Sequence, residues 1–271
     1  MKTKVAINGF GRIGRNAFKV AFERKDVEIV AINDLTDTKM LAHLRKYDTN
    51  YGNYEHSVSS DEKHIIVNDT KIPVFSEKDP SALPWGDLGV EVVIESTGFF
   101  TSADKAQAHV DAGAKKVVIS APAKDDVTQT IVLGANEDTL EGSDSIVFSN
   151  ASCTTNSMAA VMDILDREFG IEKAMMTTVH SYTADQRLQD APHSDLRRAR
   201  AAASNIIPTT TGAAKALALV MPSIKGKIYA SCIRGPGPTG SLVELTVSLG
   251  KEVDVARVNA AFEAAANGPL K

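Results

Sequence analysis

The first half of the chain alternates short apolar runs with stretches of helical periodicity. Runs rich in valine and isoleucine predict strands at residues 4–8, 27–33, 92–95, 116–120, 130–133 and 145–148. Runs that are apolar almost without interruption suit strands covered on both faces, which is typical of a mostly parallel sheet. Between the first two strands we expect an amphipathic helix, with one apolar face made by Ile13, Ala17, Val20 and Ala21.

Residues 64–75 interrupt this alternation. Two short strand-like runs flank the pair Asn68-Asp69, and turn-forming pairs of this kind join the strands of a β-hairpin. We therefore expect a hairpin inserted into the alternating pattern.

The pattern changes after Asn150. A helix is predicted from about Thr155 to Phe169, followed by a strand over residues 174–180. A long polar stretch with little periodicity then runs to about Asn205. Loops of that length in compact domains are usually functional or engaged in contacts, so we expect one of these roles here.

The last part of the chain again predicts regular elements. An apolar helix is expected near residues 212–219 and a strand over residues 241–248. A final helix follows, with one side made by Val255, Val258 and Phe262. The change of pattern predicts two domains, at residues 1–150 and 151–271.

Composition excludes some classes of partner. The 271 residues are 43% hydrophobic and 24% charged, with a net charge of −4. A nucleic-acid or membrane-surface protein needs a surplus of Lys and Arg on its binding face, so neither partner is expected. The one basic cluster, at residues 197–200, is too short to reverse this, although it suits a small anionic ligand.

Cysteine content indicates a reducing compartment. Cys153 and Cys232 are the only cysteines, too few for a disulfide framework or a zinc cluster, and no metal site is predicted. The N-terminus leads directly into a strand pattern without an apolar signal core, and no stretch is long enough to span a bilayer. We therefore expect a cytoplasmic protein.

A glycine-rich turn joins the first predicted strand to the first predicted helix. Gly9, Gly11 and Gly14 have the G-x-G-x-x-G spacing of a dinucleotide-binding loop, in which the backbone approaches a pyrophosphate at a helix N-terminus. Asp34 ends the second strand, where a carboxylate binds ribose hydroxyls and repels a 2′-phosphate, so NAD is favoured over NADP. The competing interpretations are a glycine turn without a ligand and a simple turn acid.

Cys153 lies at the predicted start of a helix among small polar residues. Unpaired N–H groups and the positive end of the helix dipole stabilise a thiolate there, whereas the competing interpretation is a small residue that fits a tight turn. His180 ends the strand that follows this helix, so the two side chains can meet, although a histidine at a strand end is often structural. The next polar residues are candidates for binding oxyanions: Thr183, Asp185, Arg187, Arg198, Arg234 and the helix-mouth segment 208–212.

A thiol, an imidazole and anion sites beside a dinucleotide fold indicate oxidation of a phosphorylated aldehyde through a thioester. Longer stretches carry a resemblance: INGFGRIGR, INDLTD, ESTGFF, ISAPAKD, SNASCTTN, HSYTADQ, DLRRARAAA and PTTTGAAKA. In these, spread from residue 4 to about residue 216, the chain resembles the phosphorylating glyceraldehyde-3-phosphate dehydrogenases. The fold class this predicts is α/β, a Rossmann-type mostly parallel sheet domain followed by an α+β catalytic domain.

The resemblance implies a role for individual residues. It implies that Cys153 is the nucleophile and His180 the base in the NAD-dependent conversion of glyceraldehyde 3-phosphate and inorganic phosphate to 1,3-bisphosphoglycerate, a step of glycolysis and gluconeogenesis. It implies that Thr183 and Arg234 bind the substrate phosphate. The implied contacts to the attacking phosphate are Ser152, Thr154, Arg198, Thr211 and Gly212, and those to the cofactor, besides the three glycines, are Arg12, Ile13, Asp34, Lys78 and Ser120. The loop after Ser181 resembles the segment that packs between subunits of the family's homotetramer.

The chain departs from the family pattern at several points. Lys78 and Ala184 stand where Arg and Asn are usual, and Gly235 and Gly237 are expected to loosen the strand beside Arg234. The sequence stops at Lys271, short of the family's usual end and of the Asn that holds the nicotinamide. On this basis we expect these 271 residues alone to bind NAD weakly and to oxidise the substrate poorly, and an extended chain to recover both.

Two alternatives stay open. Erythrose-4-phosphate dehydrogenase uses the same thiol chemistry on a longer sugar. A relative without catalytic activity would keep the cofactor fold and the subunit contacts and act as a binding protein.

Overall fold

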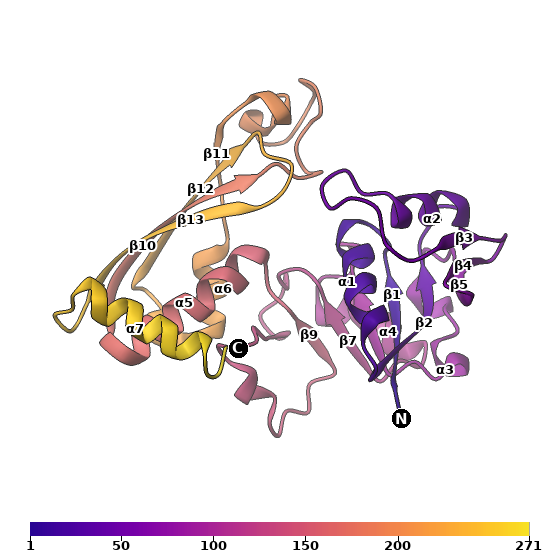
Figure 1. Ribbon diagram of the computed structural model, residues 1–271, viewed down its shortest axis with the longest axis horizontal. Helices are drawn as coiled ribbons and strands as arrows, with labels where there is room; N and C mark the ends of the chain where they lie inside the picture. The colour runs from indigo at the N-terminus through magenta and orange to yellow at the C-terminus, as the bar shows by residue number, and fades with distance from the viewer. Residues whose placement is uncertain (271) are drawn as a thin grey trace. The chain divides into compact units, whose positions relative to one another are not determined.

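The structure, a computed structural model, describes residues 1–270 and divides into two compact units (Figure 1). The first unit contains Met1–Thr130 and Gly142–Ala151. The second contains Ile131–Glu141 and the chain from Ser152 onward. Within residues 1–270, no helix combines the length and the apolar character needed to cross a membrane.

The first unit is built on a nine-stranded sheet in the order β3-β4-β5-β2-β1-β6-β7-β9-β8. The strands from β5 to β8 in this order pair in parallel, and β3, β4 and β5 pair antiparallel at one edge. This confirms the predicted α/β class with a mostly parallel sheet. The strands are β1 (Thr3–Asn8), β2 (Val27–Asn33), β3 (Val58–Ser60), β4 (His64–Val67), β5 (Thr70–Phe75), β6 (Val92–Glu95), β7 (Lys116–Ile119), β8 (Gln129–Thr130) and β9 (Val147–Ser149).

Helices of the first unit connect these strands. They are α1 (Arg12–Glu23), α2 (Thr38–Lys46), α3 (Trp85–Leu88) and α4 (Ala103–Asp111), with a short 3-10 turn at Pro80–Ala82. The predicted hairpin is confirmed as β4 and β5, and its turn residues Asn68 and Asp69 have φ of 44° and 64°. Both values lie in the left-handed region that tight hairpin turns require.

The face predicted for α1 is wrong in part. Ile13 and Val20 are 53% and 67% exposed. The side turned to the sheet is made by Gly14, Phe18 and Ala21 instead. The reason is steric: a Cβ on Gly14 would lie 2.0 Å from the Gly9 carbonyl oxygen, so the glycine must face the β1–α1 turn and the helix is rotated accordingly.

The strand predicted at residues 130–133 is also shorter than expected, because β8 is only Gln129–Thr130. The backbone N–H of Val132 donates to the Asn136 side chain at 2.8 Å, which ends strand pairing there. Ile131 and Val132 are buried, which explains why their apolar character resembled that of a strand.

The second unit has a four-stranded sheet in the order β11-β12-β10-β13. β10 pairs in parallel with β12 and antiparallel with β13, so helices and a mixed sheet make an α+β unit as predicted. The strands are β10 (Ile171–Ser181), β11 (Ile207–Thr209), β12 (Ile228–Gly235) and β13 (Ser241–Leu249). The helices are α5 (Cys153–Phe169), α6 (Ala213–Val220) and α7 (Val255–Ala266), with 3-10 turns at Glu137–Leu140, Leu196–Ala199, Ala202–Ser204 and Pro222–Ile224.

β10 is buried on one face only. Ala174, Met176 and Thr178 are buried, while Met175 and Val179, on the other face, are 51% and 42% exposed. The final helix α7 is more exposed than predicted: Val258 and Phe262 are partly buried, but Val255 is 76% exposed.

β12 (Ile228–Gly235), the strand that carries Arg234, is more regular than expected. β12 continues to Gly235, which pairs with Ser181 of β10, so Gly235 does not loosen the strand beside Arg234. The register instead places Arg234 directly beside His180.

Candidate cofactor pocket and thiol site

A cavity of about 540 Å³ lies in the first unit where β1, β2 and β6 end. In the sheet, β2 lies next to β1 on one side and β6 lies next to it on the other, so the strand order reverses at β1. Such a reversal of strand order opens a crevice at the carboxyl ends of parallel strands. The lining residues are Asn8, Gly9, Gly11, Asn33, Asp34, Leu35, Glu77, Lys78, Ser96, Thr97, Phe99 and Phe100.

The glycine loop at this cavity fits a dinucleotide phosphate. A Cβ on Gly9 would lie 2.7 Å from the backbone nitrogen of Thr97, and one on Gly14 would collide with Gly9. A Cβ on Gly11 would meet nothing within 4 Å, so this position opens to the cavity that it lines. Gly9 and Gly14 thus allow close packing, while Gly11, just before α1, leaves room for a ligand at the helix N-terminus.

Asp34 lies in the cavity wall beside Leu35 and Lys78. Its Oδ2 accepts from the backbone N–H of Phe10 at 2.7 Å, and its Oδ1 accepts from that of Thr36 at 3.0 Å. Each carboxylate oxygen keeps a further acceptor site, because it has two lone pairs. Asp34 can therefore hold the glycine loop and still accept hydrogen bonds from ribose hydroxyls.

Four predicted cofactor residues lie outside the cavity lining. The Arg12 guanidinium pairs with Asp48, and it lies over the Tyr51 ring at 5.1 Å. Ile13 is exposed, Gly14 faces Gly9, and the Ser120 backbone N–H donates to the Glu95 carbonyl. Arg12 and Ile13 are the first residues of α1, where backbone N–H groups have no acceptor within the helix and remain available to an anion.

Sequence reasoning missed most of the cavity wall. The missed residues either end a strand, as Asn8 and Asn33 do, or lie in the segment that follows one. The latter are Leu35, Glu77, Ser96, Thr97, Phe99 and Phe100. Because the carboxyl ends of parallel strands meet at one edge, the predicted ends of the first three strands were a usable signal.

In the second unit, Cys153 is the first residue of α5 and is exposed. Ser152 caps this helix, since its Oγ accepts from the Thr155 backbone N–H at 3.1 Å. The preceding residue, Ala151, has φ of 56°, a strained value for a residue with a Cβ, and the tight turn delivers the chain to the helix. The thiol is thereby fixed at the helix N-terminus.

The thiol and the predicted base meet. Cys153 Sγ lies 3.3 Å from His180 Nε2. The hydrogen bond with His180 lowers the pKa of the Cys153 thiol, and the same contact raises the pKa of His180. The pair therefore favours a thiolate beside a protonated imidazole.

The other nitrogen of His180 has two neighbours. Nδ1 lies 2.7 Å from the Ser181 carbonyl oxygen and 2.6 Å from Arg234 Nη1, and Arg234 also donates to that carbonyl at 3.0 Å. A guanidinium only donates, so Nδ1 either donates to Ser181 or accepts from Arg234. The charge of Arg234 opposes the rise in the His180 pKa, which makes this arginine an electrostatic neighbour of the thiol pair.

The remaining predicted phosphate residues lie in other local groups. Arg198 Nε donates to Thr209 Oγ1 at 2.7 Å, and its Nη1 pairs with Asp185. Thr211 Oγ1 accepts from the Ala213 backbone N–H at 3.2 Å, at the start of α6, where Gly212 is the cap residue. Thr183 lies in a turn with Gln186, and Thr154 follows Cys153 in α5.

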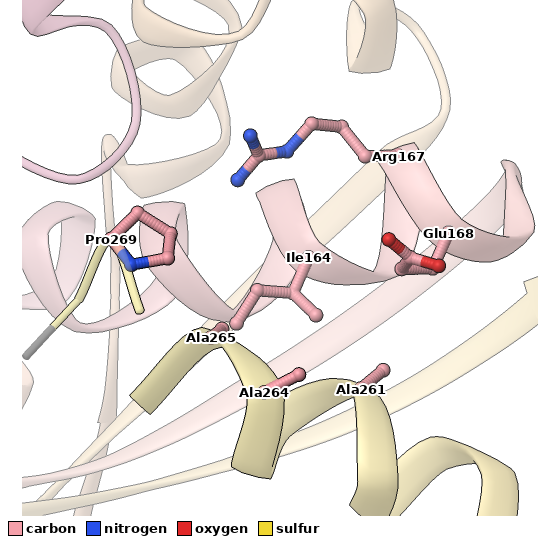
Figure 2. Close-up of a pocket in the computed structure, with 7 residues that line it drawn as sticks. All are labelled: Ile164, Arg167, Glu168, Ala261, Ala264, Ala265 and Pro269. Carbon is pink, nitrogen blue, oxygen red and sulfur yellow. The ribbon is translucent and has the colours of Figure 1, made fainter. Parts of the chain in front are cut away.

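A smaller cavity of about 310 Å³ between α5 and α7 has a different character (Figure 2). Its wall contains three alanines, and the Arg167 at its edge pairs with Asp163. The full lining is Ile164, Arg167, Glu168, Ala261, Ala264, Ala265 and Pro269. No cysteine or histidine lines it, so it is separate from the Cys153–His180 pair.

A dinucleotide-type sheet with a glycine loop, and a thiol that contacts an imidazole, are together typical of nicotinamide-dependent oxidoreductases that react through a cysteine. Comparison with protein families agrees. Residues 3–103 match the model of the glyceraldehyde 3-phosphate dehydrogenase NAD-binding domain, and residues 152–271 match that of its C-terminal domain. The chain belongs to the glyceraldehyde-3-phosphate dehydrogenase family, and its cofactor is NAD.

Individual relatives are similar over nearly the whole chain. Glyceraldehyde-3-phosphate dehydrogenase 1 of Bacillus cereus is 56% identical over 269 residues, which are 99% of this chain and 80% of the relative. The Mycolicibacterium smegmatis enzyme is 56% identical over 279 residues, covering 100% and 82%. The Geobacillus stearothermophilus enzyme is 55% identical over 271 residues, covering 100% and 81%.

Alanine substitutions at Gly11 and at Gly14 should change different properties, NAD binding in one case and stability in the other. Gly14→Ala forces a Cβ into the Gly9 carbonyl and should lower the free energy of unfolding by about 3 kcal/mol. Gly11→Ala should leave unfolding nearly unchanged and weaken NAD binding, because its Cβ enters the cavity. Urea unfolding and NAD titration measure the two effects, and equal destabilisation by both variants would contradict this account.

Cys153 should react with iodoacetamide at neutral pH much faster than Cys232. Contact with His180 lowers the pKa of the Cys153 thiol, whereas burial raises that of Cys232. His180→Asn should slow the alkylation of Cys153 by roughly tenfold for each unit by which the pKa of the Cys153 thiol rises. Peptide mapping of alkylation against pH measures this, and equal rates for the two cysteines in the native protein would refute it.

Proposed function

We propose that this chain catalyses the NAD-dependent oxidation and phosphorylation of glyceraldehyde 3-phosphate to 1,3-bisphosphoglycerate, within glycolysis and gluconeogenesis. The observation that carries the proposal is the 3.3 Å contact between Cys153 Sγ and His180 Nε2 at the N-terminus of α5. A thiolate forms covalent intermediates with aldehydes, and an imidazole at this distance can move the protons that the reaction requires. Family membership supports the same reaction.

The proposed chemistry begins at the thiol. The Cys153 thiolate attacks the aldehyde carbon, and the new oxyanion takes the proton from the His180 imidazolium, which gives a hemithioacetal. His180 Nε2 then removes the hydroxyl proton as the carbon loses its hydrogen with the bonding electrons, and a thioester to Cys153 forms. NAD, when bound, supplies the acceptor for that hydride. A phosphate oxygen then attacks the thioester carbonyl, the carbon–sulfur bond breaks, and Cys153 leaves as a thiolate.

Two sets of residues are proposed to hold the anions. Arg234 and Thr183 would bind the substrate phosphate, and the proximity of Arg234 to His180 supports a place near the reacting carbon. The inorganic phosphate would be held at two helix starts and by one arginine, through Ser152, Thr154, Arg198, Thr211 and Gly212. Residues 1–150 would form the cofactor domain and residues 151–271 the catalytic domain, although Ile131–Glu141 pack in the second unit. The NAD site would contain Gly9, Gly11, Arg12, Ile13, Gly14, Asp34, Lys78 and Ser120.

A homotetramer in the cytoplasm is proposed as the form in which the chain acts. Large apolar side chains of the long segment after β10 support assembly, since Leu188, Leu196 and Ile206 are 82%, 81% and 72% exposed. The two cysteines are unpaired, which suits a reducing compartment. Sedimentation and cell fractionation measure the assembly and the location.

A rapid-mixing assay of NADH formation tests the function. The native chain with glyceraldehyde 3-phosphate and NAD should give a burst, followed by phosphate-dependent turnover. Cys153→Ser should abolish the burst and retain NAD binding, because the glycine loop lies on other elements. A faster burst with erythrose 4-phosphate would select the alternative substrate, and NAD binding without any burst would select the non-catalytic binding protein.

The choice of cofactor should depend on Asp34. We expect NAD to be preferred over NADP, because a carboxylate in the cavity wall repels a 2′-phosphate. Asp34→Ala should lower the ratio of the NADP dissociation constant to the NAD dissociation constant by roughly tenfold, although it also removes an acceptor for the Phe10 N–H. Dissociation constants for both cofactors measure the ratio, and equal affinity in the unmodified chain would be evidence against this role.

A further inference from the structure

Glu95, the last residue of β6, is 1% exposed, and its carboxylate is surrounded by donors. Oε1 accepts from the backbone N–H of Thr97 at 2.7 Å and from its hydroxyl. Oε2 accepts from Asn8 Nδ2 at 2.6 Å and from His109 Nε2 at 3.0 Å. Each oxygen thus has both of its acceptor positions used.

The direction of these hydrogen bonds is fixed from outside the group. The indole Nε1 of Trp85 can only donate, and it donates to His109 Nδ1 at 3.0 Å. Nδ1 accepts this hydrogen bond, so the imidazole proton lies on Nε2, pointing at Glu95. The Thr97 hydroxyl accepts from the Phe99 backbone N–H at 3.1 Å, so its own proton also goes to Glu95.

The amide of Asn8 is oriented in the same way. The Glu77 backbone N–H donates to Asn33 Oδ1 at 2.9 Å, and Asn33 Nδ2 donates to the Glu77 carbonyl at 2.9 Å. Asn33 Nδ2 also donates to Asn8 Oδ1 at 2.7 Å. Asn8 must therefore turn its own NH₂ group toward Glu95.

The residues of this hydrogen-bonded network around Glu95 form part of the wall of the cofactor cavity. Asn8, Asn33, Glu77 and Thr97 line it, and they belong to segments that end or follow β1, β2, β5 and β6. The Thr97 backbone is also the surface on which Gly9 packs, because a Cβ there would lie 2.7 Å from its nitrogen. The position of Thr97 therefore sets the position of the glycine loop.

Stability alone does not account for this carboxylate. Its four donors include no lysine or arginine, and a buried carboxylate held in this way costs more than a well-packed apolar side chain of similar size. We propose that Glu95 is a positioning residue for NAD: it gathers four donors so that the Thr97 turn and the glycine loop keep the spacing that the dinucleotide needs. The proposal rests on the cavity being the NAD site.

Glu95→Gln tests the proposal with little change in shape. The amide replaces one acceptor oxygen by an NH₂ group that faces two donors, so the Thr97 turn or the Asn8 amide must move. The dissociation constant for NAD should rise about tenfold or more, and the KM for NAD should rise with it while alkylation of Cys153 without NAD stays within about twofold.

Glu91→Gln is the matched control. Glu91 precedes the same strand at its other end, where it accepts from the Lys4 backbone N–H and from Lys115 Nζ, and it does not line the cavity. This variant should bind NAD within about twofold of the native chain. An unchanged NAD constant in folded Glu95→Gln would overturn the proposal, whereas failure of the native chain to bind NAD would overturn the proposed function instead.

Trp85→Phe decides the question if Glu95→Gln does not fold. Trp85 lies outside the cavity lining, and the change removes the donor that fixes the His109 proton together with part of a fully buried ring. A rise of about threefold or more in the NAD constant supports positioning through the network, and a lower melting temperature with an unchanged constant overturns it.

Discussion

The crossing of β1 and α1 leaves no room for a side chain, and the cofactor unit is arranged around this constraint. Gly14 must face the Gly9 carbonyl, since a Cβ there would approach it to 2.0 Å. This contact sets the rotation of α1, so that Phe18 is buried, with its ring 5.6 Å from that of Phe10, while Ile13 is exposed. The same turn brings the first N–H groups of α1 to the carboxyl end of the sheet, where an anion can bind.

The fold class and the central site pair were predictable from sequence because they depend on local order along the chain. A helix followed at once by a strand brings the chain back, so Cys153 and His180 meet although 27 positions separate them. The turn residues Asn68 and Asp69 act locally as well. Apolar periodicity alone failed for α1, because the contact of Gly14 with Gly9 outweighs the preference of Ile13 and Val20 for burial.

Other features depend on contacts between segments far apart in sequence and had no local signal. The neighbourhood of Arg234 is set by the register between β10 and β12, which pairs it with His180 across 54 positions. Glu95 lies in a stretch that carried the family resemblance, yet nothing in the sequence shows that Asn8 and His109 donate to it. The order of the strands in the sheet decides such contacts.

Buried or half-buried acidic groups have a different use in each unit. The Glu95 carboxylate is held by donors whose directions are fixed by Trp85 and Asn33, so it suits a constant geometry. In the proposed reaction the charge on Cys153 instead forms and disappears, and its partner His180 gains or loses a proton. A permanent cation in place of His180 would stabilise the thiolate but could not accept the proton of the hemithioacetal. The proposed reaction therefore calls for a titratable partner at the thiol, whereas a carboxylate with donors of fixed direction suffices at the cofactor cavity.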